Sequence, residues 1–140
     1  MATRSTIAVV NPDNSISQIY CHWDGYIKHN GKILVEHYTT LEKVQELISL
    51  GDLSSLEMNI HPTDSSHSFE TPQDHTCVYY DRDRGEEDVE PKNFYCFHDY
   101  LKECQFEEFN YLFKDNKWAC TENADDFYDV AEALIVRNNS

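Results

Sequence analysis

The sequence predicts an α+β fold: a single domain in which about three helices pack on a mostly antiparallel sheet, with a hairpin at each end of the chain. Three observations support this prediction. The chain has 140 residues, of which 40% are apolar and 13% aromatic, enough to bury one compact core. Pairs of β-rich segments flank polar turns near both ends. Elsewhere, apolar residues recur at the three- and four-residue spacing that is typical of helices.

The first hairpin is predicted from Ser5–Val10 and Ile16–Trp23, with Pro12 and its Asn and Asp neighbours as the turn. Gly31–Tyr38 then has the spacing of one or two helical turns.

A second helix is predicted to begin at Thr39–Glu42, which has the capping-box sequence. Leu41–Ile48 carries its apolar stripe, and Gly51 follows as a left-handed C-cap.

Residues 52–76 are predicted to form a long loop, because they are rich in Ser, Asp, His and Pro. Loops of this length often carry a function. A strand at Cys77–Tyr80 and a solvent-exposed stretch at Asp81–Pro91 follow. Asn93 is predicted to cap a helix that runs to Cys104. Its buried stripe would be Phe97, Leu101 and Cys104.

The second hairpin is predicted from Phe109–Phe113 and Lys117–Thr121, which flank the two-residue turn signal Asp115–Asn116. Asn123 is predicted to cap a final helix, and residues 137–140 form a tail. The buried stripe of that helix would be Phe127, Val130, Ala131, Leu134 and Ile135. The predicted order of elements is ββαβαββα, within one domain that spans residues 1–140.

The cysteines predict a reduced, cytoplasmic protein, because they are odd in number, form no C-x-x-C pair and follow no secretory leader. They are Cys21, Cys77, Cys96, Cys104 and Cys120. No stretch approaches the ~20 apolar residues that span a bilayer, so we expect no membrane partner.

The densest polar and aromatic cluster is Tyr20–Tyr26, at the end of a predicted strand, where functional sites are often found. Its ligand-binding candidates are His22, Trp23, Asp24 and Tyr26. Core packing is the simpler interpretation of Cys21 and the aromatic side chains.

Two other chemistries for this cluster are weaker. Catalysis by Cys21 would need His29 or His37 as the base, because neighbouring residues of a strand point to opposite faces. A metal site made of His22, Asp24, His29 and His37 matches no known ligand spacing. We therefore predict no catalytic residue, no metal ion and no cofactor.

Arg82 and Arg84 lie in a second cluster, Asp81–Gly85. Ion pairs with neighbouring carboxylates are the simplest role for them. The functional alternative is a pocket in which both guanidinium groups bind a phosphate beside Trp23 and Tyr26, as a nucleotide-type ligand would require.

The net charge of −15 is unevenly distributed. Residues 1–61 contain four basic and seven acidic side chains, whereas residues 62–140 contain seven and nineteen. Such acidity excludes binding of nucleic acid or anionic lipid by simple charge attraction.

Acidic side chains spaced like phosphates would instead suit a protein partner with a basic, nucleic-acid-binding surface. The partner-binding candidates are Glu86, Glu87, Asp88, Glu90, Asp125, Asp129 and Glu132. Of these, the last three fall at i, i+4 and i+7 of the predicted final helix. The alternative role of these carboxylates is solubility alone.

Several segments resemble a group of small proteins of bacteriophages, prophages and other mobile elements. They are Ala2–Ala8, Tyr20–Tyr26, Gly31–Leu34, His37–Tyr38, Gly51–Leu56, Arg82–Glu86 and Phe109–Phe113. The likeness covers most of the chain up to Trp118, and Tyr20–Tyr26 is its most specific part. Because the group has no established enzymatic activity, the resemblance implies a setting: a phage-encoded accessory protein in the bacterial cytoplasm.

These observations favour a non-enzymatic protein that binds and inhibits a host defence protein, with its acidic second half imitating nucleic acid. The alternative is a module that binds a nucleotide or other small molecule and sequesters a host immune signal. An enzyme ranks third, because no acid–base pair can be assigned.

Overall fold

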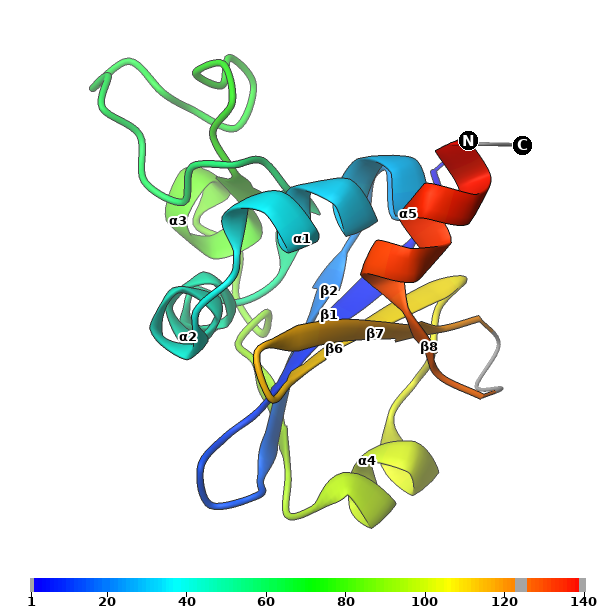
Figure 1. The fold of residues 1–140 in the computed structure, drawn as a ribbon. Coiled ribbons are helices and arrows are strands. Elements are labelled where there is room, and N and C mark those ends of the chain that lie inside the picture. The colour runs from blue at the N-terminus through cyan, green and yellow to red at the C-terminus, as the bar shows by residue number, and fades with distance from the viewer. Residues whose placement is uncertain (1, 123–125, 139–140) are drawn as a thin grey trace.

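The computed structural model describes residues 2–122 and 126–138, which form an eight-stranded sheet with helices on both faces (Figure 1). The strands are β1 (Ser5–Val10), β2 (Ile16–Cys21), β3 (Leu53–Ser55), β4 (Val78–Tyr79), β5 (Lys92–Phe94), β6 (Phe109–Lys114), β7 (Lys117–Thr121) and β8 (Tyr128–Asp129). The helices are the single π-turn η1 (Ile27–Gly31), α1 (Lys32–His37), α2 (Leu41–Ser49), α3 (Tyr80–Arg84), α4 (Phe97–Glu103) and α5 (Val130–Asn138).

The α+β class and both hairpins are confirmed. β1 pairs antiparallel with β2, and β6 with β7. Asp115 and Asn116 both adopt positive φ, as a tight two-residue hairpin turn requires. The strand order is β4-β3-β2-β1-β6-β7-β8, and β5 adds to β2. Five of the seven pairings between described strands are antiparallel, so the sheet is mostly antiparallel. The two hairpins join through a parallel β1–β6 pair at the centre.

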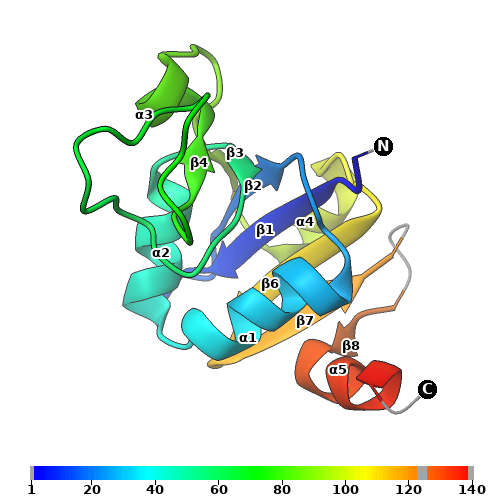
Figure 2. The same cartoon turned by 90° about the horizontal axis from the view of Figure 1, so that it is seen from above.

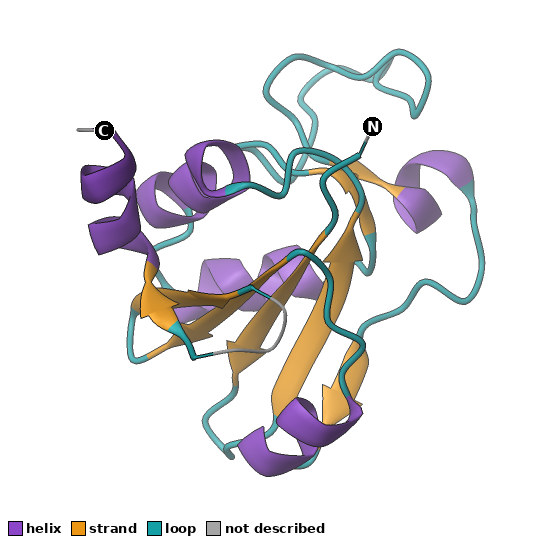
Figure 3. Ribbon diagram, turned by 90° about the vertical axis from the view of Figure 1, so that its right-hand side faces the viewer, coloured by secondary structure: helices purple, strands orange, loops and turns teal. Residues whose placement is uncertain are grey.

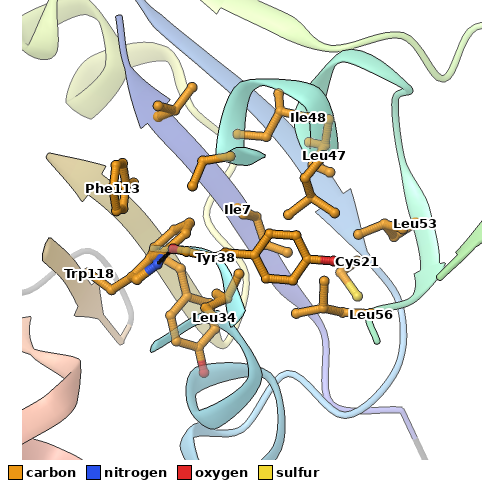
Figure 4. Packing of buried hydrophobic residues seen from close by; sticks show 14 of the residues in the cluster. Ile7, Cys21, Leu34, Tyr38, Leu47, Ile48, Leu53, Leu56, Phe113 and Trp118 are labelled. Atoms are coloured by element: carbon orange, nitrogen blue, oxygen red, sulfur yellow. Dashed lines mark hydrogen bonds between the residues drawn. The ribbon is translucent and has the colours of Figure 1, made fainter. Parts of the chain in front are cut away.

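The main core lies between the sheet and the layer of α1, α2 and α5 (Figure 2). Tyr38 is at its centre, fully buried between residues of the sheet and the helices (Figure 4). The Trp118 indole donates to the Tyr38 carbonyl at 2.9 Å, and the Tyr38 hydroxyl donates to the Glu57 carbonyl at 2.7 Å. A smaller core lies under α4 on the opposite face (Figure 3).

The predicted helix from Asn93 to Cys104 is wrong in its first half. Asn93 lies in β5, which pairs with the free edge of β2, and its carboxamide accepts from the Ser17 hydroxyl at 2.8 Å. The helix therefore begins only at Phe97 and buries Tyr100 instead of the predicted stripe. Phe97 and Leu101 are 43% and 42% exposed, and Cys104 is half-buried.

Between the two hairpins, the predicted cap and C-cap of α2 are close to the structure, whereas α3 and β3 were not predicted. Thr40, not Thr39, caps α2, because the Thr40 hydroxyl accepts from the Lys43 amide. Gly51 has φ +92, which confirms the left-handed position after α2. The stretch expected to be exposed from Asp81 begins with a helical turn, α3. Within the long loop, Leu53–Ser55 forms β3, and Asn59 bridges to Thr76.

The final helix begins later than predicted. Tyr128–Asp129 pairs with β7 as β8, so α5 starts at Val130. Val130 and Leu134 are buried as predicted, but Ala131 is exposed, Phe127 precedes the helix and Ile135 is 62% exposed. The predicted cap, Asn123, lies outside the described residues, as do residues 139–140 of the predicted tail. The first two tail residues belong to α5.

Among the described helices, none is long and apolar enough to cross a membrane.

Candidate functional site

Arg82 joins the two ends of the long loop. From α3, one terminal nitrogen of its guanidinium donates to the Ile60 carbonyl at 2.6 Å, and the other donates to the Cys77 carbonyl at 2.8 Å. The same guanidinium lies over the Tyr79 ring, 4.8 Å from its centroid. One side chain thus holds together two residues, Ile60 and Cys77, that are 17 positions apart in the sequence. We call Arg82 and the groups that bind its guanidinium the clamp.

Asp83 completes the clamp. Its carboxylate accepts two hydrogen bonds from Arg82, both 2.9 Å, and one from the Tyr79 amide at 2.8 Å. The Asp83 side chain is only 5% exposed. Burial alone would raise the pKa of Asp83, but the hydrogen bonds from Arg82, the Tyr79 amide and His67 outweigh it and lower the pKa.

His67 connects the middle of the loop to the same carboxylate. Its side chain is 3% exposed, and Nε2 lies 3.3 Å from Asp83 Oδ1. Nδ1 accepts from the Gln73 amide at 2.9 Å, so these contacts assign the proton to Nε2. The Gln73 carboxamide in turn accepts from the Thr63 and Asp64 amides. The loop is therefore held in one conformation although it has little regular structure.

About half of the protein's net negative charge of −15 lies on and around this loop. We define the acidic lobe as residues 57–90, which carry ten acidic and two basic side chains, a net charge of −8. Eight of the acidic side chains are exposed: Asp64, Glu70, Asp74, Asp81, Glu86, Glu87, Asp88 and Glu90. Arg84 is the exposed cation among them, and its guanidinium lies 4.9 Å from the Phe69 ring centroid and 3.9 Å from the Glu86 carboxylate.

The predicted acidic partner-binding set is divided by the sheet. Glu86, Glu87, Asp88 and Glu90 follow α3 at the β4 edge, whereas Asp129 and Glu132 lie at the β8 edge. Seven strands at the usual spacing place the edges roughly 30 Å apart.

The predicted helical face at i, i+4 and i+7 is also wrong, because Asp129 precedes α5 and accepts from the Glu132 amide at its start. Asp125 lies outside the described residues.

The predicted ligand-binding aromatic residues form an exposed corner after β2. Trp23 and Tyr26 are 44% and 42% exposed. His22 packs edge-on against Trp23 with ring centroids 4.6 Å apart, and His22 Nδ1 shares a 2.7 Å hydrogen bond with the Tyr20 hydroxyl. Asp24 is exposed and has φ +57, so it forms part of the turn.

The two arginines do not form the predicted phosphate pocket. Arg82 commits four of its five N–H donors to the clamp, since its Nε, Nη1 and Nη2 all donate to protein oxygens. Ion pairing with a neighbouring carboxylate, the simpler interpretation, is confirmed for Arg82. Arg84 also has a neighbouring carboxylate partner, Glu86 at 3.9 Å, and its guanidinium lies over the Phe69 ring.

Cys21 is a core residue. It is fully buried, and burial raises the pKa of its thiol to about 12, opposite to the change a nucleophilic thiol requires. Among the described residues, no three His, Cys, Asp or Glu side chains gather closely enough to hold a metal ion.

The roles of His67, Gln73 and Asp83 are not predictable from the sequence. The three residues span 17 positions, and none lies in a periodic segment. The one available signal was the acidic neighbour of each arginine in Asp81–Gly85.

Comparison with known proteins gives no further guide: no family model, curated protein or solved structure matches the chain.

Proposed function

We propose that the protein is a non-enzymatic binding protein whose acidic lobe engages a basic, nucleic-acid-binding surface of a host protein and thereby inhibits it. One observation carries the proposal: eight exposed carboxylates lie on and beside a loop whose ends and middle are held by the contacts of Arg82, Asp83 and His67. Three of the eight belong to the loop, and the other five belong to α3 and the segment that follows it. A loop fixed before binding loses little conformational entropy on binding, so its charge can be used for affinity and fast association. The resemblance to phage proteins gives the proposed setting, the bacterial cytoplasm.

The proposal confines the partner-binding surface to the β4 edge. Glu86, Glu87, Asp88 and Glu90 remain in it, and the exposed carboxylates of the long loop join them. Asp129 and Glu132 lie at the other edge of the sheet and are not part of this surface.

The test is affinity capture from a bacterial lysate on the immobilised full chain. We expect captured protein to be released by 0.5 M NaCl and by excess duplex DNA, because both compete for a basic surface. The triple variant Glu86→Gln, Glu87→Gln, Asp88→Asn should lose this capture. The matched control, Glu36→Gln, Glu103→Gln, Glu132→Gln, removes three exposed charges outside the lobe and should keep it. Equal capture by the two triple variants, or capture that DNA does not displace, would reject the proposal.

A second candidate, nucleotide sequestration, depends on a hollow of about 460 Å³ beside Phe69 and Arg84. This volume suits a small ligand, but Glu70 and Asp83 also line the hollow and oppose a phosphate. Calorimetry against a nucleotide panel decides between the two: heat that disappears in Arg84→Ala would favour sequestration, and no heat from any nucleotide would remove it.

A further inference from the structure

A second, smaller pocket lies outside the acidic lobe, at a notch in the sheet. The free edge of β2 pairs with β5 at Gln18 and with β3 at Cys21, so neither strand covers the edge at Tyr20. The Asp52 carboxylate takes the place of a strand there and accepts from the Tyr20 amide at 2.8 Å. The resulting pocket has a volume of about 160 Å³ and is floored by β2 on the α4 side of the sheet.

Gln18 is an unusual residue for this floor. Its side chain lines the pocket and the residue is only 5% exposed. Within residues 2–122 and 126–138, nothing forms a hydrogen bond with its carboxamide. Within the described chain, the Tyr100 hydroxyl is the only fully buried side-chain polar group without a partner, so the Gln18 carboxamide is open to the pocket. It therefore offers both a donor and an acceptor to a molecule that enters the pocket.

Two charged side chains beside Gln18, those of Lys92 and Glu107, form no ion pair with any described residue. Lys92 is the cross-strand neighbour of Gln18 in β5, and no carboxylate of the described chain lies within ion-pair distance of that ammonium. Glu107 is held by its backbone, because the Asn110 carboxamide both donates to its carbonyl and accepts from its amide. Its carboxylate has no hydrogen bond or ion pair to any described residue.

Asp52 is partly desolvated. Burial raises the pKa of its carboxyl group, although the Tyr20 amide and the positive charge of Lys92 act in the other direction. The pocket therefore presents two acidic groups, one ammonium and one free amide, and their charges are not neutralised internally.

We propose that this pocket binds a small zwitterion, a free α-amino acid or a compound with the same pair of charges. The ligand's ammonium group would lie against Asp52 and Glu107, its carboxylate against Lys92, and its remaining polar atoms against Gln18. The volume corresponds to roughly five water molecules, which accommodates glycine or serine and excludes a nucleotide. This proposal is independent of the acidic lobe.

The test is calorimetric titration of the full chain with glycine and L-serine as zwitterions, methylamine as the ammonium alone, acetate as the carboxylate alone, and glycerol as a neutral molecule. We expect binding by at least one of the two zwitterions, and at least tenfold weaker binding of methylamine, acetate and glycerol. Lys92→Met and Gln18→Leu should each weaken zwitterion binding at least tenfold.

Lys32→Met, which removes an exposed ammonium from α1, is the matched control and should bind as the unaltered chain does. A thermal melt establishes that each variant is folded, and Lys92→Met changes an exposed residue, so the test does not depend on Gln18→Leu folding. The proposal is overturned if neither zwitterion binds at 10 mM, if methylamine binds as tightly as serine, or if Lys92→Met binds like Lys32→Met.

Discussion

Arg82 and Arg84 are two residues apart on the same helical turn, yet only Arg82 is expected to stabilise the fold. Arg82→Ala removes the donors of two loop carbonyls and leaves the Asp83 carboxylate, which is 5% exposed, without its ion-pair partner. Breaking a buried ion pair from one side costs about 3–5 kcal/mol. Because the Arg82 side chain is 22% exposed, we expect the lower end, about 3 kcal/mol.

Arg84→Ala is the matched control. The Arg84 side chain is 58% exposed and its nearest carboxylate oxygen, on Glu86, is 3.9 Å away. Exposed pairs of this kind contribute ~0–1 kcal/mol, so the free energy of unfolding should hardly change.

Urea denaturation followed by circular dichroism measures both variants, provided that their m-values agree. A loss of about 3 kcal/mol lowers the melting temperature of a domain of this size by roughly 10 °C. Limited proteolysis should cut the loop of Arg82→Ala faster than that of Arg84→Ala. If both variants lost the same free energy of unfolding, the clamp would not stabilise the native state and the reasoning would fail.

Three further predictions concern buried groups. The Tyr100 hydroxyl is buried without a partner among the described residues, so Tyr100→Phe should leave the free energy of unfolding unchanged or raise it by up to about 1 kcal/mol. The Tyr111 hydroxyl donates to the Gly25 carbonyl at 2.6 Å, so Tyr111→Phe should lower the free energy of unfolding by about 1 kcal/mol. Gly51→Ala should lower the free energy of unfolding by more than the ~1 kcal/mol that an unfavourable φ alone costs, because a Cβ there would lie 2.5 Å from the Val89 carbonyl oxygen. Thermal melting or limited proteolysis measures this loss. The pKa of Asp83 is lowered in the folded state, so its contribution to stability is complete above about pH 4 and is lost as the pH falls further. When the free energy of unfolding is measured against pH, it should fall less steeply in acid for Arg82→Ala than for the unaltered chain.

The elements that depend on neighbouring residues in the sequence were predicted correctly. Turn residues identified both hairpins, and the apolar spacing of Leu41–Ile48 identified α2. Asn93 shows why the rest was missed. Asn is a good helix cap in isolation, but Lys92–Phe94 pairs with the free edge of β2 and forms a strand. No local sequence pattern encodes that long-range pairing.

The candidate site was predictable only in part, for the same reason. The excess of acid in the second half of the chain is visible in the sequence, and so is the proximity of Arg82 to carboxylates. Which arginine is held by the fold depends on the Ile60 and Cys77 carbonyls and on His67, which come from a segment without periodicity. The division of the acidic residues between two sheet edges requires the strand order, which the parallel β1–β6 pair sets.

The concentration of charge in the acidic lobe should destabilise the protein that carries it. Glu86, Glu87 and Asp88 are consecutive and exposed, well within the ~8 Å over which charges interact at physiological salt. Added NaCl should therefore raise the melting temperature, because it screens this repulsion more than it screens the partly buried Arg82–Asp83 pair.

Neutralising these three residues together should raise the free energy of unfolding in low salt by about 1 kcal/mol and reduce its salt dependence, since each like-charge contact costs about 0.2–0.5 kcal/mol. The matched triple variant on α1, α4 and α5, whose charges are dispersed, should gain less. A melting temperature that falls as NaCl is added would show that attraction between surface charges dominates, contrary to this argument. If the lobe binds a basic partner, the substitutions that stabilise the free protein are the ones that weaken binding, and a simple loss of folding cannot produce that pair of opposite effects.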